Sequence, residues 1–378
     1  MILKKCRFII TQDEEKRILE NVDLKINEEK HIIEEIGAEV TRETSEEIMD
    51  CSKYAVIPGI INPHIHLFTV SMRGMDVTSW EDLWYKAHNL VEYPSILKES
   101  WRKSLNIISS TGTTLIAPTE ISYEEFIKQA NTFVDIAGGP FVFSMPVKVS
   151  GKTIHVSSLS NVKPEIFKEV VDEAYKENIN VSIHVSNTRD EVFEFKKVYG
   201  KFPVEYLDHI GALRENVILV GLEWITNWEL KAISNAGCKV VLIPSCSMYY
   251  ALGGLPPIIE FMKENTTLGI GSCSLTCNNG FLIQEAKTLL YYVRSSYWSF
   301  KVTVQHVFDI MTLGNAAILN IKNWKIAEGL KVNLTLINIE NTKFTPLSKK
   351  NIVQNIVMYS EPYDVKHIII KGKKYTIH

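Results

Sequence analysis

The segment PGIINPHIHLF, residues 58–68, determines how the rest of the chain is interpreted. An apolar run ends there in His64 and His66, which are separated by one residue. Side chains along a β-strand alternate between two faces, so a strand at this position puts both imidazoles on the same face. Two neighbouring imidazoles can chelate a divalent metal. Taken alone, the pattern fits a packed or solvent-facing histidine pair equally well.

Downstream of His66 the sequence repeats a two-part pattern, in which a short β-branched run precedes a longer amphipathic stretch. This alternation is typical of βα units. The short runs lie at residues 113–120, 141–147, 179–186, 217–224, 238–244 and 268–274, and the amphipathic stretches at 123–138, 163–178, 189–200, 227–237, 256–265 and 281–296. Together with the strand of His66 they make roughly seven or eight units over about 250 residues, the usual size of a (β/α)₈ barrel. A doubly wound sheet is the alternative.

Both ends of the chain have the pattern of β-structure. Short apolar runs alternate with turns up to residue 57, and strand-like runs return at residues 330–339, 351–360 and 365–377. Chain ends commonly lie close together in a folded protein. We therefore expect a composite β-sandwich from residues 1–57 and 317–378, beside a barrel formed by residues 58–316.

Composition narrows the class of protein. The chain has 378 residues, of which 46% are hydrophobic and 22% charged, as in an ordinary globular protein. Its net charge is −3, so it has no basic field that would attract the phosphates of a nucleic acid. Six cysteines without a C-x-x-C pair make a disulfide framework improbable. The first residues contain no signal-peptide core, and the long uncharged stretch at residues 240–259 is broken by proline and glycine. We expect a cytoplasmic protein that does not contact membranes.

Three motifs together resemble the amidohydrolase superfamily: PGIINPHIH at residues 58–66, MRG at 72–74 and STGTTLIAP at 110–118. The chain is most similar to the branch of triazine chlorohydrolases, guanine deaminases and adenosine-type deaminases, and the terminal strands resemble that branch too. The resemblance implies a (β/α)₈ TIM barrel with a composite β-sandwich, and hydrolysis of a non-peptide C–N bond. It also implies a small-molecule substrate such as a nitrogen heterocycle, and a possible homo-oligomer.

The resemblance also implies a metal site. Three family ligands match His64, His66 and His184, and three neutral imidazoles suit one divalent metal, most simply zinc. The alternative for His184 is a core histidine with a satisfied hydrogen bond. The eighth-strand aspartate of the family is replaced by Cys273. A thiolate also binds zinc, which would give a closed, structural set of four ligands.

Further positions depart from the family pattern. The glutamate three residues after the fifth-strand histidine is Asn187, and the sixth-strand histidine is Gly221. An amide cannot perform general acid–base chemistry. Since the aspartate that would accept a proton from water is also lost at Cys273, we expect absent or very weak activity on guanine or adenosine.

Several residues could supply replacement chemistry. Glu223, two residues after Gly221, could provide the missing carboxylate, although a solvated strand-end residue is the more frequent case. Cys273 could act as a nucleophile, and Cys246 and Cys277 are expected near it, although buried thiols are usually inert. Arg73 could bind an anionic substrate group or form a structural salt bridge.

Three functions therefore remain open. The chain is a metal-dependent hydrolase, a non-catalytic binding scaffold, or a repurposed enzyme that uses Cys273 or Glu223.

Overall fold

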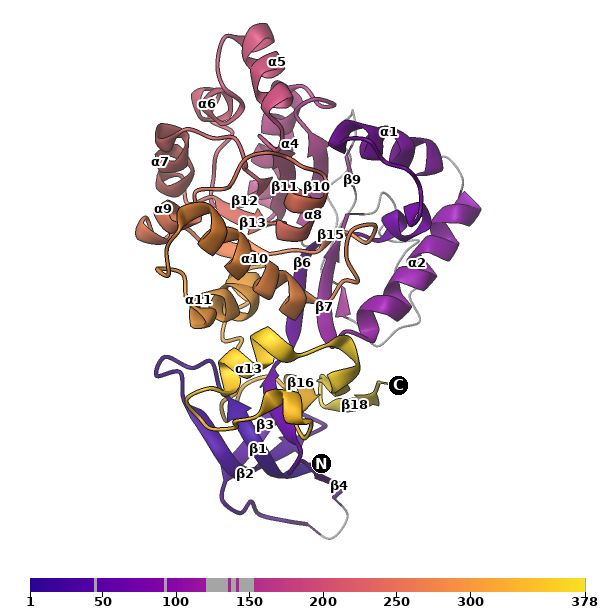
Figure 1. Cartoon of the computed structure of the whole chain (residues 1–378), viewed down its shortest axis with the longest axis vertical. Coiled ribbons are helices and arrows are strands. Elements are labelled where there is room, and N and C mark those ends of the chain that lie inside the picture. The colour runs from indigo at the N-terminus through magenta and orange to yellow at the C-terminus, as the bar shows by residue number, and fades with distance from the viewer. Residues whose placement is uncertain (44–45, 92–93, 120–134, 137–140, 143–152, 378) are drawn as a thin grey trace.

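The computed structural model describes residues 1–43, 46–91, 94–119, 135–136, 141–142 and 153–377. Figure 1 shows parallel strands surrounded by helices, and below them a sheet to which both chain ends contribute. The (β/α)₈ barrel with an added β-domain from both termini, expected from the sequence, is confirmed. The boundaries at residues 57/58 and 316/317 stay a prediction.

The barrel strands pair in parallel in two runs, β15-β6-β7-β8 and β9-β10-β11-β12-β13-β14. The two runs meet where the Asn315 amide donates hydrogen bonds to the carbonyls of Ile61 on β6 and Ile270 on β14. The segment between β8 and β9 lies outside the described residues. The strands are β6 (Ile60–His66), β7 (Thr113–Pro118), β8 (Asp135–Ile136), β9 (Phe141–Val142), β10 (Thr153–Ser158), β11 (Asn180–Val185), β12 (Val217–Gly221), β13 (Lys239–Leu242), β14 (Leu268–Ile270) and β15 (Cys273–Ser274).

Helices follow most of these strands and cover the outside of the barrel (Figure 1). Of the expected helix at residues 123–138, only β8 is described, and there the chain is a strand instead. The strand β10 was not expected. The helices are α1 (Trp80–Val91), α2 (Pro94–Ser109), α4 (Pro164–Lys176), α5 (Arg189–Tyr199), α6 (Pro203–His209), α7 (Asn227–Asn235), α8 (Pro244–Tyr249), α9 (Ile258–Lys263), α10 (Leu282–Tyr297), α11 (Val304–Asp309) and α12 (Asn315–Ile318).

The added domain is one eight-stranded sheet built from both ends of the chain. Its order is β18-β17-β16-β5-β1-β2-β3, with β4 beside β1, and the antiparallel pair β5–β16 joins the N- and C-terminal halves. Alternate residues face opposite ways, so Val56 packs into the core of this domain while Ala55 and Ile57 join the large core shared with the barrel. The strands are β1 (Ile2–Ile10), β2 (Ile18–Asn27), β3 (Ile32–Gly37), β4 (Ile48–Asp50), β5 (Tyr54–Pro58), β16 (Asn333–Asn338), β17 (Val365–Ile370) and β18 (Lys373–Thr376).

The strand expected at residues 351–360 is wrong, because this segment is the helix α13 (Ile352–Tyr359). Its apolar residues Ile352, Val353, Ile356 and Val357 follow helical spacing and form one buried stripe. The buried Asn355 amide donates to the carbonyls of Phe344 and Pro346, which fixes the helix on the loop before it.

All six cysteines are free thiols, which agrees with the expected lack of a disulfide framework. Within the described part of the chain, no helix has the length and apolar character that crossing a bilayer would require.

Gly112 lies where the barrel packs against the terminal sheet. It precedes β7 with a φ of +79°, and a Cβ there would lie 2.8 Å from both Thr335 Cγ2 and Val365 Cγ1. The Thr335 hydroxyl donates to the Gly112 carbonyl over 2.8 Å. Both the left-handed backbone and the close approach of β16 and β17 therefore require glycine.

We predict that Gly112→Ala lowers the free energy of unfolding by about 2–4 kcal/mol, because it adds steric overlap to an unfavourable φ. Gly200→Ala is the matched control, since Gly200 has a φ of +75° but no atom within 4 Å of the added carbon. It should cost about 1 kcal/mol. Urea unfolding of both variants measures the difference, and equal losses would contradict the proposed close packing at the junction.

Candidate metal centre

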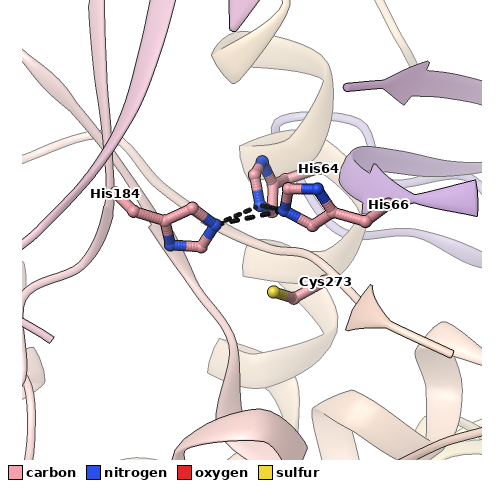
Figure 2. A group of neighbouring side chains, drawn as sticks. All are labelled: His64, His66, His184 and Cys273. Atoms are coloured by element: carbon pink, nitrogen blue, oxygen red, sulfur yellow. Dashed lines mark hydrogen bonds between the residues drawn. The ribbon is translucent and has the colours of Figure 1, made fainter. Parts of the chain in front are cut away.

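Three histidine side chains converge inside the barrel mouth. His64 and His66 end β6, and His184 lies near the end of β11. The Nε2 atoms are 3.0 Å apart for His64 and His184, 3.1 Å for His64 and His66, and 3.2 Å for His66 and His184 (Figure 2). All three side chains are buried. The structure thus brings together the three histidines that the sequence analysis proposed as ligands.

Neighbouring side chains orient two of these rings. The Asn187 amide makes hydrogen bonds with both of its polar atoms. Its nitrogen donates to the carbonyls of Val185 and Val220, and its oxygen accepts from His184 Nδ1, 3.1 Å away. Thr119 Oγ1 lies 2.6 Å from His66 Nδ1. An imidazole that donates from Nδ1 has its lone pair on Nε2, so both contacts direct an Nε2 lone pair at the centre.

Burial also keeps the cluster neutral. It lowers the pKa of His184 to about 3, and it lowers the pKa of His64 and His66 well below the usual value, with further repulsion from neighbouring histidines. Neutral imidazole is the form that binds metal.

The spacing fits a tetrahedral ion. Zn–N bonds of 2.0–2.1 Å at tetrahedral angles separate the nitrogens by roughly 3.3 Å, close to the observed 3.0–3.2 Å. His66 and His184 both direct a lone pair at the centre, and a proton on His64 Nε2 can be donated to only one of them. The donor set therefore fits a divalent ion with three imidazole ligands.

Cys273 faces the same centre from β15, with a φ of +53°, and its thiol is fully buried. The four ligand atoms of the group lie within 4.8 Å of one another. The three Nε2 atoms lie within 3.2 Å of one another, so the longest separation in the group joins Cys273 Sγ to a histidine nitrogen. One zinc ion bound by both atoms would hold that sulfur and nitrogen roughly 3.6 Å apart. Burial raises the pKa of this thiol. Cys273 is therefore placed at the edge of the histidine cluster (Figure 2).

The three cysteines expected near this face do gather there. Cys246 Sγ is 3.1 Å from Cys277 Sγ, and the Cys246 thiol also interacts with Cys273. Burial raises the pKa of Cys246, so thiolate is scarce at neutral pH.

Glu223 occupies the space left by the missing sixth-strand side chain. Gly221 has a φ of +97° and Leu222 of +68°, so the chain leaves the strand and simple alternation does not extend to Glu223. Even so, a Cβ on Gly221 would lie 2.8 Å from Glu223 Oε2 and 2.2 Å from the Asn187 amide. Only glycine leaves room for both groups.

The Glu223 carboxyl is buried, and only one of its two oxygens has a hydrogen-bond partner among the described residues. Ser247 donates its hydroxyl to Oε1, while Oε2 has no hydrogen-bond partner among the described residues. Burial raises the pKa of this carboxyl to about 8. Glu223 is therefore protonated at neutral pH and able to donate.

Arg73 is exposed, and its guanidinium donates to the carbonyls of Leu275 and Asn278. It fixes the loop that follows β15. A role in substrate binding stays a prediction.

Two tryptophans of α1 lie against the histidines. The Trp84 ring centroid is 4.6 Å from that of His66, and the Trp80 centroid is 5.5 Å from that of His184. Trp84, Thr119 and Asn187 have supporting roles that the sequence pattern does not predict. The spacing of Trp80 and Trp84, four apart on a helix, was the available signal for the tryptophan pair.

Solved structures share the fold over nearly the whole chain. Atrazine chlorohydrolase from Arthrobacter aurescens, crystallised with zinc, superposes with a TM-score of 0.85 at 16% identity, over 99% of this chain and 94% of that one. An adenosine deaminase from Xanthomonas campestris with bound zinc gives 0.88 at 17% identity, over 100% and 92%.

Proteins with similar sequences include deaminases. The 5-methylthioadenosine/S-adenosylhomocysteine deaminase of Thermococcus sibiricus is 25% identical over 98% of this chain and 93% of its own length. A 5'-deoxyadenosine deaminase of Methanosphaera stadtmanae is 24% identical over 90% and 87%.

The model of the amidohydrolase family matches residues 148–374. That range includes His184, Glu223 and Cys273 and more than half of the 378 residues. The chain belongs to the amidohydrolase family.

Proposed function

We propose that this protein is a metal-dependent hydrolase of a non-peptide C–N bond in a small nitrogen heterocycle, with one zinc ion held by His64, His66 and His184. The convergence of three neutral Nε2 atoms is the observation on which the proposal rests. Zinc in two solved family structures supports the choice of metal. When bound, the ion would supply Lewis acidity and activate water.

Glu223 is the proposed acid–base residue. Its protonated carboxyl can donate to a departing nitrogen and then accept a proton, and Oε2 is free for this role among the described contacts. A nucleophilic Cys273 is less well supported, because its raised pKa keeps it as a thiol.

The two tryptophans support a planar substrate. Trp80 and Trp84 place aromatic rings beside His184 and His66, and such rings stack on heterocycles. The deaminases among the relatives act, by name, on adenosine derivatives. We place the reaction in the cytoplasm, in agreement with six free cysteines.

A non-catalytic scaffold is the second candidate. The same tryptophans lie directly against the metal-binding rings, and a thiol stands where the family has an aspartate. Both features suit a closed, structural zinc site. The scaffold predicts zinc capped by Cys273, whereas the hydrolase predicts a position open to water.

We predict that His66→Ala abolishes stoichiometric zinc binding, because only two imidazoles remain and the Cys273 thiol at the edge of the cluster has a raised pKa. Thr119→Val should weaken zinc binding by about 10-fold or more, since it removes the contact that orients His66. Elemental analysis and chelator competition measure both effects, with the exposed His209→Ala as control. Unchanged zinc content in His66→Ala would rule out the ligand set.

Cys273→Ser separates the two candidate functions. If the thiol caps the ion, the variant loses most of its zinc affinity, as the scaffold requires. If the metal is held by three histidines, affinity falls by less than about 10-fold, which is the expected result.

The raised pKa of Glu223 predicts a dependence of stability on pH. The folded state holds a proton that the unfolded state releases above its ordinary pKa, so this residue makes stability fall as pH rises from about 4.5 to about 8. Glu223→Gln should remove that part of the slope. Glu194→Gln, at an exposed glutamate of α5, is the control. Parallel pH–stability curves for wild type and Glu223→Gln would show that the carboxyl is not held neutral.

Guanine and adenosine should be turned over very weakly, because Asn187 and Cys273 replace the family's proton-transfer carboxylates. Ammonia release from zinc-loaded protein is the measurement. Turnover of about 1 s⁻¹ or faster, an ordinary enzyme rate, would refute this expectation.

A further inference from the structure

The layer of the barrel core beneath the metal centre is polar. On β10, Thr153 and His155 alternate with Ile154 and Val156, which pack into the large apolar core around the strands. His155 pairs in register with Ser182 on β11, two residues before His184. Bulky apolar residues usually fill barrel interiors. A histidine and a serine at this level therefore require an explanation.

These polar groups lack partners in the described structure. His155 and Ser182 are each 1% exposed, and neither the two ring nitrogens of His155 nor Ser182 Oγ has a hydrogen-bond partner among the described residues. A neutral imidazole has one donor and one acceptor nitrogen, and here neither has a partner among the described residues. A buried polar group without a hydrogen-bond partner destabilises the folded state, because the group has lost its hydrogen bonds to water.

His64 has the same deficiency. His66 Nδ1 has Thr119 and His184 Nδ1 has Asn187, whereas His64 Nδ1 has no partner among the described residues. Metal-bound histidines almost always donate this N–H to an oxygen. The ring of His155, whose nitrogens also lack partners among the described residues, lies beside that of His64, with centroids 5.6 Å apart and planes inclined by 56°.

We propose that an ordered water molecule binds in this layer between His64 and His155, accepting a hydrogen bond from His64 Nδ1 and donating to a ring nitrogen of His155. Ser182 Oγ lies beside His155 in register and provides a further partner. Buried waters typically make about three such bonds. His155 is thus a positioning residue, which acts on the metal through His64.

His155 is not assigned as a metal ligand. The donor atoms that converge belong to His64, His66, His184 and Cys273, and His155 is not among them in the described structure. Its place is one layer deeper in the barrel, below His184.

The proposal rests on the proposed metal site, and three variants test it. His155→Leu removes the hydrogen-bonding partner of the water, His155→Gln restores one, and His209→Leu is the exposed control. In cobalt-substituted protein, His155→Leu should shift the visible absorption bands and weaken metal affinity by about 10-fold, and His155→Gln should recover most of both. Identical spectra and affinities for wild type and His155→Leu would overturn the proposal.

Metal-free protein separates this inference from the metal site itself. If the layer holds water, His155→Leu lowers the thermal midpoint, because Ser182 and His64 lose a bridging partner. If the layer is dry, His155→Leu raises the midpoint, since it removes two unsatisfied nitrogens, and the proposal fails even when zinc binds as expected. Ser182→Ala, a smaller change, should lower the midpoint slightly in the hydrated case and raise it in the dry one.

Discussion

The proposed metal site depends on three buried, neutral imidazoles whose Nε2 atoms lie within 3.2 Å of one another. Even a proton on His64 Nε2 can be donated to only one of the other two nitrogens, so the arrangement fits a cation between the rings. The barrel makes this possible because parallel strands end at one rim, which brings β6 and β11 together although their histidines are more than a hundred residues apart in the chain. Asn187 then orients the ring of His184, and Thr119 orients the ring of His66.

The departures from the family pattern form a connected set. Gly221 lacks a side chain, and the Asn187 amide and the Glu223 carboxyl fill that space. The Asn187 amide cannot transfer protons and instead orients His184, while burial raises the pKa of the Glu223 carboxyl in the interior. This buried carboxyl is the basis for proposing altered chemistry.

Much of the architecture could be predicted from the sequence because the signals were local. Alternating βα patterns predicted the barrel, strand-like runs at both ends predicted the added sheet, and the H-x-H motif with His184 predicted the three histidines that the structure brings together. The failures have local causes too. Residues 352–359 are apolar enough to suggest a strand, but their stripe has helical spacing. β10 was missed because its inward residues are polar, and His155 was missed with it. The contacts of Asn187 and Glu223 depend on backbone turns at residues 221 and 222 that no pattern reveals.

Anomalous diffraction at the zinc edge tests the central claim most directly. We expect a single anomalous peak bonded to Nε2 of His64, His66 and His184, with the sulfur of Cys273 outside bonding distance. A zinc-saturated crystal without a peak among these histidines, or with the metal bound elsewhere, would contradict the account.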